Sequence, residues 1–179
     1  MKLVILDRDG VINEDSDAFI KSVAEWKPIP GSLEAIARLC HAGWRVAIAS
    51  NQSGIGRGLM DYGALFAIHD RLQRAVCDLG GRIDAIEFAP DHPDRPSEFR
   101  KPAPGMLLDL ARRLGATLDR VPAVGDSWRD VEAARAARAR PVLVRTGNGR
   151  RTESEHRAGL DGVAVHDDLA AFAASLIGS

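Results

Sequence analysis

Short apolar segments alternate with amphipathic ones along the whole chain, and this alternation limits the fold more than any other feature of the sequence. The apolar runs have the length of strands, and polar or glycine-containing turns bound them. We predict buried β-strands at residues 3–6, 45–49, 83–88, 121–124, 141–144 and 163–165.

Helical patterns fill the intervals between these strands. Leu33, Ile36 and Leu39 share one face of a helix for which Ser32 is the predicted N-cap. Further helices are predicted after Asp61, over 106–114, over 129–138 and after Asp168. Strands that alternate with helices predict an α/β fold, a doubly wound, mostly parallel sheet with helices on both faces. We expect residues 1–179 to form a single domain.

Composition and charge narrow the class of partner. Hydrophobic residues make up 45% of the 179 residues, enough for one sizeable core, and 24 Lys and Arg residues balance 25 Asp and Glu residues. Such a chain has no net field that would attract nucleic acid or an anionic membrane. The sequence shows neither a signal-peptide pattern nor an apolar run approaching the roughly 20 residues that cross a bilayer. We expect a cytoplasmic monomer with a small-molecule partner and reduced thiols at Cys40 and Cys77.

Two carboxylates follow the first predicted strand, in the stretch LDRDGVINED at residues 6–15. In open α/β sheets, ligands bind beyond the carboxyl ends of the strands, where the strand order reverses. Residues two apart on an extended chain point the same way, so Asp7 and Asp9 are predicted to face one pocket. Asp-x-Asp-Gly is also a common turn, so this stretch alone does not establish a functional site.

Polar groups also follow the other predicted strands. The turn SNQSG at residues 50–54 offers a hydroxyl and backbone N–H groups to an anion. Arg100 and Lys101 precede a helix whose N-terminus favours anions, and Asp126 follows a glycine at the next strand end. Each feature alone is more often a turn, a surface charge or a helix cap. Together they place acids, a hydroxyl and a cation at one edge of one sheet.

This combination predicts phosphoryl-transfer chemistry. Clustered carboxylates repel one another and raise one another's pKa values, so three of them together require a cation. Oxygen ligands without His or Cys favour a hard ion, and we expect Mg²⁺. A hydroxyl and an ammonium facing that ion would hold a phosphoryl group while a carboxylate attacks phosphorus.

In order and spacing, four motifs resemble those of the haloacid dehalogenase (HAD) superfamily of phosphohydrolases: Asp7-Arg8-Asp9-Gly10, Ser50-Asn51, Lys101 and Gly125-Asp126-x-x-x-Asp130. The resemblance implies that Asp7 is the nucleophile, Asp9 the general acid/base, and Ser50 and Lys101 the groups that hold the phosphoryl group. It implies Mg²⁺ at Asp7, Asp9 and Asp126. It also implies substrate contacts from Asp15, Asn51, Gln52, Ser53, Arg57 and Arg100.

Within this superfamily the chain is similar to the heptose bisphosphate phosphatases, notably in LDRDGVIN, SNQSGIGRG, FRKPAPGMLL, VGDSWRDVEAA and PVLVRTG. This implies removal of the 7-phosphate of a heptose 1,7-bisphosphate through a phosphoaspartate, in the synthesis of nucleotide-activated heptose. Two alternatives remain open. One is a histidinol-phosphate phosphatase of the same superfamily, although SNQSGIGRG favours the heptose branch. The other is a phosphoacceptor receiver domain, although receivers carry their acceptor aspartate where this chain has Ser50.

One segment departs from the family pattern. Family members often carry a zinc loop before the Arg-Lys pair, built from Cys-x-His and Cys-x-Cys. The expected ligands are replaced here by Ala89, Asp91, Ser97 and Phe99. One remaining imidazole at His92, without a thiolate, makes a poor structural zinc site. We expect no zinc, and a loop stiffened by its prolines instead.

Segment lengths predict an open site. The intervals between the motifs leave no room for a separate cap domain. Substrate selection is then predicted to come from the short loops 14–19, 53–57 and 91–100. Arg57 and Arg100 at such a mouth suit a substrate with a second phosphate.

Overall fold

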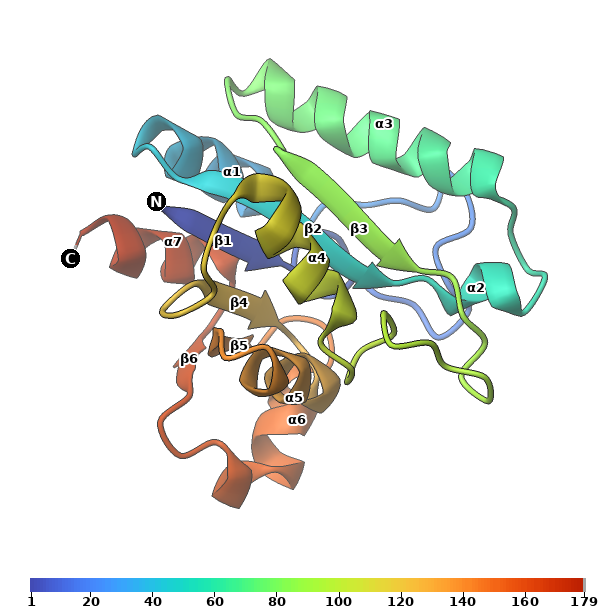
Figure 1. Cartoon of the computed structure of the whole chain (residues 1–179). Coiled ribbons are helices and arrows are strands. Elements are labelled where there is room, and N and C mark those ends of the chain that lie inside the picture. The colour runs from blue at the N-terminus through green and yellow to red at the C-terminus, as the bar shows by residue number, and fades with distance from the viewer. Residues whose placement is uncertain (179) are drawn as a thin grey trace.

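The fold, described for residues 1–178 by a computed structural model, is built around a six-stranded sheet in which all neighbouring strands are parallel (Figure 1). The strand order is β3-β2-β1-β4-β5-β6. The strands are β1 (Leu3–Leu6), β2 (Arg45–Asn51), β3 (Ala85–Ala89), β4 (Pro122–Gly125), β5 (Arg140–Val144) and β6 (Ala164–His166). Each predicted strand is confirmed, with bounds that differ by no more than two residues.

Seven α-helices and one 3₁₀ helix are present among the described residues. They are α1 (Ser32–His41), α2 (Ser53–Gly56), α3 (Tyr62–Asp78), α4 (Gly105–Leu114), α5 (Trp128–Ala136), α6 (Gly149–Glu155), η1 (Arg157–Gly159) and α7 (Leu169–Ile177). The side chains of Asp61 and Asp168 cap α3 and α7 as predicted. Ser32 does not cap α1, because Gly31 takes the cap position and the Ser32 hydroxyl donates to the Ile12 carbonyl instead.

The side chains of each strand alternate between two cores, as a period of two requires. Val4 and Leu6 of β1 enter one core, which α1, α3 and α7 cover, whereas Leu3 and Ile5 enter the other, beneath α4 and α5 (Figure 1). All four are buried, each contributing about 1.5–3 kcal/mol to the hydrophobic driving force. This two-faced burial confirms the doubly wound α/β arrangement.

The order of the strands reverses between β1 and β4. The chain proceeds from β1 outwards to β2 and β3, then crosses to β4 and continues outwards in the opposite direction. The two central strand ends are tied by a hydrogen bond from the Asp7 N–H to the Val124 carbonyl, 2.8 Å long. This reversal opens a crevice beyond the carboxyl ends of β1 and β4.

Loops rather than a further domain surround this crevice. Within residues 1–178, no segment forms a separate cap, and the connections β1–α1 and β3–α4 run past the ends of the strands as extended loops (Figure 1). None of the helices described here combines the length and the apolar character that a membrane span requires.

Candidate active site

A cavity of about 310 Å³ lies at the carboxyl edge of the sheet. Its walls come from the ends of β1, β2 and β4, from the loops that follow β1, β2 and β3, and from the starts of α5 and α6. Every residue that the sequence predicted for the site lines this one cavity: Asp7, Asp9, Asp15, Ser50, Asn51, Gln52, Ser53, Arg57, Arg100, Lys101 and Asp126. The predicted convergence of the strand ends is therefore confirmed, while the individual roles remain predictions.

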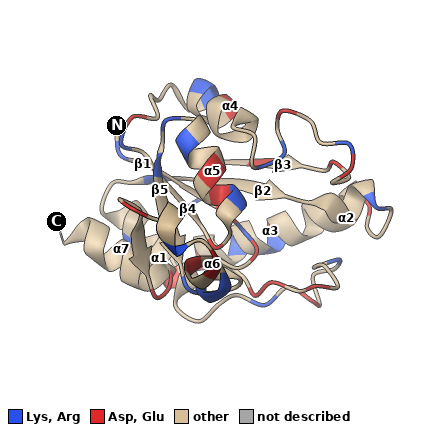
Figure 2. Cartoon of the chain, turned by 90° about the horizontal axis from the view of Figure 1, so that it is seen from below, with Lys and Arg blue, Asp and Glu red and all other residues tan. Residues whose placement is uncertain are grey.

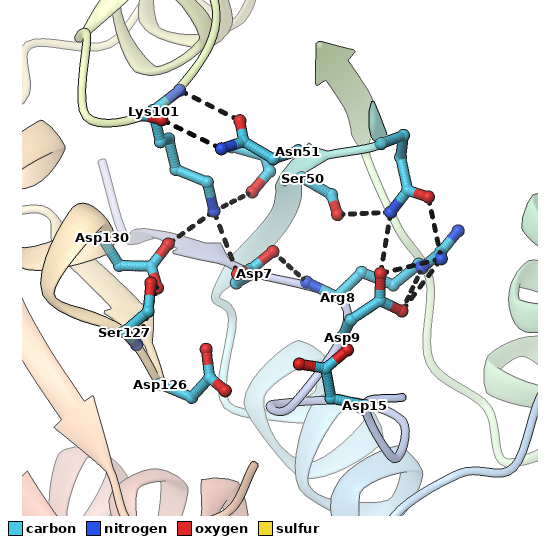
Figure 3. A network of polar contacts seen from close by, with 12 residues as sticks. Asp7, Arg8, Asp9, Asp15, Ser50, Asn51, Lys101, Asp126, Ser127 and Asp130 are labelled. Carbon is cyan, nitrogen blue, oxygen red and sulfur yellow. Dashed lines mark hydrogen bonds and ion pairs between the residues drawn. The ribbon is translucent and has the colours of Figure 1, made fainter. Parts of the chain in front are cut away.

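Lys101 lies at the floor of the cavity, between two carboxylates (Figure 3). Its ammonium is 3.1 Å from the Asp7 carboxylate and 2.5 Å from that of Asp130, and it donates a 2.9 Å hydrogen bond to the Ala49 carbonyl. Burial alone would favour the neutral amine, but Asp130 and Asp7 raise the pKa of Lys101 above its ordinary value. Lys101 is thus a permanent buried cation beside Asp7.

Asp130 ties this lysine to the start of α5. One oxygen accepts from Lys101, and the other accepts from the N–H and the hydroxyl of Ser127 in a capping box. Burial would raise the pKa of the Asp130 carboxyl, but these partners outweigh it and hold that pKa below its usual value. Gly125 must lack a side chain, because a β-carbon there would overlap the Asp130 carboxylate.

Three carboxylates offer oxygens that all lie within 4.8 Å of one another: Asp7, Asp126 and Asp130. Burial raises the pKa of Asp7 well above its ordinary value despite Lys101, and burial with the charge of Asp130 raises the pKa of Asp126 to about 7. Both raised pKa values indicate that the negative charge of these buried carboxylates is not balanced by enough positive charge nearby. An all-oxygen donor set with this deficit fits a hard divalent cation such as Mg²⁺.

Asp126 is packed closely from two sides. Its carboxylate accepts from the Asn148 backbone N–H at 2.7 Å, and its carbonyl accepts from the Thr152 hydroxyl at 3.0 Å. On the other side is Gly10, at φ +81°, where a β-carbon would overlap the same carboxylate. The glycine of the Asp-Arg-Asp-Gly motif therefore makes room for an acid that lies 116 positions further along the chain (from residue 10 to residue 126).

The Asp9 carboxylate turns away from this cluster, toward Arg8 (Figure 3). It accepts two hydrogen bonds of 2.9 Å from the Arg8 guanidinium, one of 2.9 Å from the Gln52 amide and one of 2.8 Å from the Asn13 amide. The Asp9 side chain is 20% exposed and still reaches the cavity wall. Asp7 and Asp9 thus share a pocket but occupy different environments.

Asn51 pairs with the backbone of Lys101 in both directions. Its amide donates to the Lys101 carbonyl and its side-chain oxygen accepts from the Lys101 N–H, each at 3.0 Å. This pairing fastens the loop that carries the lysine to the end of β2. On the opposite wall, the Asn148 amide donates to Asp15 at 3.0 Å and so links the first loop to the segment after β5.

Arginines border the mouth of the cavity. Arg100 is buried, and its pKa is lowered first by burial and then by the neighbouring charges of Arg129 and Arg57, with Asp91 opposing. Neither Arg57 nor Arg129 has an ion-pair partner among the described residues. The charges of Arg57 and Arg129 beside Arg100 favour an anion at this opening.

Sequence reasoning assigned no role to several residues that line the same cavity. In the sequence, Asp130 stood out only as the last residue of the motif Gly125-Asp126-x-x-x-Asp130. Other lining residues outside the predicted set include Ser127, Arg129, Asn148 and Arg151. The one signal in the sequence was a carboxylate four residues after Asp126, in the first turn of α5. The positions of the other residues depend on how α5 and α6 approach the site.

Comparisons with known proteins agree with this geometry. A family model described as HAD-hydrolase-like matches residues 98–172. A D-glycero-β-D-manno-heptose-1,7-bisphosphate 7-phosphatase of Bordetella bronchiseptica is 55% identical over 178 residues, covering 99% of this chain and 98% of that protein. The protein of the same name from Pseudomonas aeruginosa is 51% identical, covering 98% of this chain and 97% of its own length.

Solved structures give the same result. The crystal structure of D,D-heptose 1,7-bisphosphate phosphatase from B. bronchiseptica, complexed with magnesium and phosphate, matches with a TM-score of 0.96 over 99% of both chains. That from Burkholderia thailandensis, 46% identical, matches with a TM-score of 0.78 over the full length of both chains. The chain therefore belongs to the HAD-like hydrolases and, within them, to the family of the heptose 1,7-bisphosphate phosphatases.

Proposed function

We propose that the protein is a Mg²⁺-dependent phosphatase that removes the 7-phosphate of D-glycero-D-manno-heptose 1,7-bisphosphate, in the synthesis of nucleotide-activated heptose for lipopolysaccharide core. The observation that carries the proposal is the Asp7 carboxylate, 3.1 Å from a buried lysine at the floor of a polar cavity. Similarity to phosphatases of this name extends over 99% of the chain.

Asp7 acts as the nucleophile in this mechanism. One of its oxygens attacks phosphorus, the bond between phosphorus and the sugar oxygen breaks, and an aspartyl phosphate forms. Lys101 and the Ser50 hydroxyl hold the oxygens of the transferred group, and the fixed charge of Lys101 stabilises negative charge that develops there. Asp130, which is not itself at the phosphoryl group, keeps the Lys101 ammonium in place.

We propose that Asp7, Asp9 and Asp126 hold Mg²⁺. The Asp9 carboxylate already accepts four hydrogen bonds, so Asp9 offers its backbone carbonyl, which accepts none among the described residues. When bound, the ion neutralises the carboxylates and the phosphoryl oxygens. Both oxygens of Asp130 are occupied by Lys101 and Ser127, which leaves Asp130 outside the ligand set.

Asp9 acts as the general acid and then the general base. It donates a proton to the departing sugar oxygen, and afterwards takes one from the water that attacks the aspartyl phosphate. The second attack releases inorganic phosphate and restores Asp7. For both steps the Asp9 side chain turns from its contacts with Arg8, Gln52 and Asn13 into the cavity, whose wall it forms on the side opposite to Lys101 (Figure 3).

The remote phosphate of the substrate binds at the mouth of the cavity. Arg57 and Arg100, with Arg129 beside them, supply the positive charge, and Asp15, Asn51, Gln52 and Ser53 line the space between the two phosphates. Planar guanidinium groups bind phosphate oxygens in pairs, which favours a bisphosphate over a monophosphate.

Specificity constants test the substrate assignment. We would measure kcat/KM for both anomers of heptose 1,7-bisphosphate, and for histidinol phosphate and fructose 1,6-bisphosphate. Heptose 1,7-bisphosphate should be preferred by roughly 10²-fold or more: histidinol phosphate lacks a second phosphate for the arginines, and fructose 1,6-bisphosphate holds its two phosphates on a different sugar. If kcat/KM for heptose 1,7-bisphosphate were no higher than for the other two substrates, the substrate assignment would be wrong. The assignment as a phosphatase would still hold.

We also propose that residues 1–179 act as one domain, as a monomer and in the cytoplasm. One chain supplies the whole cavity, and Cys40 and Cys77 are free thiols, as is usual in a reducing compartment. Lys and Arg are interspersed with Asp and Glu over the elements in Figure 2, so neither nucleic acid nor a membrane surface is expected as a partner. Light scattering on a sizing column measures the oligomeric state.

A further inference from the structure

A buried polar cluster lies behind the reaction centre, and its members are Arg8, Asp9, Ser50 and Gln52. The Arg8 side chain, between the two aspartates of the motif, points into the protein and has no exposed surface. Its Nε and Nη2 atoms bind both oxygens of Asp9 at 2.9 Å, and Nη2 also donates to the Gln52 side-chain oxygen at 3.1 Å. Burying a guanidinium is costly unless it is paired and hydrogen-bonded, and Asp9 and Gln52 supply these partners here.

The chemistry of its neighbours fixes the orientation of the Gln52 amide. An arginine can only donate hydrogen bonds and a carboxylate can only accept them. Gln52 Oε1 therefore faces Arg8, and Nε2 faces Asp9 Oδ2 at 2.9 Å. The opposite orientation would set N–H against guanidinium and oxygen against carboxylate, so neither contact would survive.

This orientation also decides which way the Ser50 hydroxyl points. Gln52 Nε2 lies 2.8 Å from Ser50 Oγ, and its second hydrogen leaves the hydroxyl only the role of acceptor in that contact. Ser50 carries one hydroxyl hydrogen, which must then point elsewhere. Because Ser50 is only 1% exposed and its open side is the cavity, the hydrogen points toward the phosphoryl position.

We infer that Gln52, oriented by Arg8, is a positioning residue that turns the Ser50 O–H toward the transferred phosphoryl group. The inference rests on the proposed phosphoryl transfer to Asp7. It explains why an arginine separates the two aspartates and why the glutamine follows the serine by two residues. Gln52 acts here through Ser50, without contact to the reacting atoms.

A double-mutant cycle distinguishes this role from mere packing. The substitutions are Ser50→Ala and Gln52→Met, singly and together, the second of which keeps the length of the side chain but removes the amide. The assay is single-turnover transfer from an aryl phosphate with an acidic phenol, because this leaving group does not need the proton of Asp9. Inhibition by orthovanadate, a mimic of the transferring group, gives a second reading.

Gln52→Met should slow transfer and weaken orthovanadate inhibition about 10-fold in the wild-type background, as expected for one oriented hydrogen bond. In the Ser50→Ala background, Gln52→Met should change neither the rate of transfer nor the inhibition by orthovanadate. Equal factors in both backgrounds, or no slowing in the wild-type background, would overturn the inference. If Ser50→Ala itself left transfer unchanged, the proposed role of Ser50 would fail together with the inference.

Gln52→Glu provides a second test in case the Gln52→Met protein folds poorly. Its shape is that of glutamine, but an ionised carboxylate can only accept, so the Ser50 hydrogen must turn inward. The new carboxylate also repels Asp9 where the Nε2 contact was, so the test uses only the part of the slowing that disappears in the Ser50→Ala background. That part should be larger than in Gln52→Met. A Gln52→Glu protein that transfers as fast as the wild type would contradict the inference. Unfolding curves of all variants confirm that each is compared in its folded state.

Discussion

Lys101 joins the nucleophile to the start of α5 through its contacts with Asp7 and Asp130. Lys101→Ala would remove the charge aimed at the phosphoryl group and leave both carboxylates without their cation. We expect kcat/KM to fall by roughly 10² or more. Lys2→Ala is the matched control, since Lys2 is exposed and immediately precedes β1, at the amino end of that strand. An unchanged kcat/KM in Lys101→Ala would make this lysine a structural residue only.

Asp7 and Asp9 are expected to differ in what their loss does. Asp7→Asn should abolish activity on every substrate, because no nucleophile remains. Asp9→Asn should slow transfer from the sugar phosphate by about 10² to 10⁴ and transfer from an acidic aryl ester far less, since only the sugar alkoxide needs a proton.

Rapid-quench measurements on Asp9→Asn check this division of roles. With the aryl ester the variant should show a burst of about one equivalent and then stall, because no base activates water against the aspartyl phosphate. Equal losses for the two substrates, without a burst, would mean that the Asp9 side chain acts neither as the acid nor as the base.

His69 is buried, and its imidazole makes stability depend on pH. Burial, followed by the charge of Arg8, lowers the pKa of this imidazole to about 4, whereas an unfolded chain titrates near 6.5. The unfolded state thus binds the proton first, and the free energy of unfolding falls as the pH falls from about 6.5 to about 4. This contribution amounts to roughly 3 kcal/mol when complete.

His69→Phe removes the titrating group and keeps a ring against Phe88. Urea unfolding at pH 7 and pH 4 should show a smaller loss of stability in the variant than in the wild type. Parallel losses in the two proteins would show that other groups account for the acid sensitivity.

At the scale of elements, the loop between β3 and α4 holds its shape without thiolates. The Ser97 hydroxyl donates to Asp91 at 2.9 Å and accepts from the Phe99 N–H, while Arg100 donates to the Asp91 carbonyl. We expect purified protein to contain less than about a tenth of an equivalent of zinc, since one imidazole is a weak site. Elemental analysis measures this, and stoichiometric zinc would overturn our interpretation of residues 89–99.

The elements that the sequence did not predict are those without an apolar pattern. Helix α6 reads GRRTESE and has no hydrophobic stripe; its Thr152 is buried through the hydrogen bond to the Asp126 carbonyl. Ser32 is a good cap by local preference, yet the Ile12 carbonyl, 20 positions away, takes its hydroxyl. Both differences arise because a distant partner outweighs a local preference.

For the whole molecule, the sequence predicted the floor of the site better than its wall. Parallel strands end at one edge by rule, so Asp7, Ser50 and Asp126 could be expected to converge. Asn148 and Arg129 could not, because their places depend on the paths of the segments after β5 and β4. The direction of the Asp9 carboxylate could not be predicted either, because it depends on the buried side chain of Arg8, which binds both of its oxygens.

Removal of Mg²⁺ should abolish activity and leave the fold intact. The two main hydrophobic cores lie on either side of the sheet, and the carboxyl cluster lies at its edge. Without a cation, the raised pKa values of Asp7 and Asp126 let them take up protons and so avoid repulsion. EDTA should therefore eliminate turnover at constant circular dichroism, and Mg²⁺ should restore it. Loss of the circular-dichroism signal together with activity would show that the ion is structural.

The strand reversal between β1 and β4 also bears on how such an enzyme can diverge. Asp7, Ser50 and Asp126 lie at the ends of strands whose backbone is fixed by the sheet, and Asn51 fixes the backbone of Lys101, whereas the arginines of the mouth lie on short loops and helix starts. Substitutions at the mouth change which phosphate ester enters without disturbing the groups that cleave it. Natural or laboratory selection for a new ester should accumulate its changes at positions such as Arg57, Arg100 and Arg129 and leave Asp7, Lys101 and Asp126 untouched.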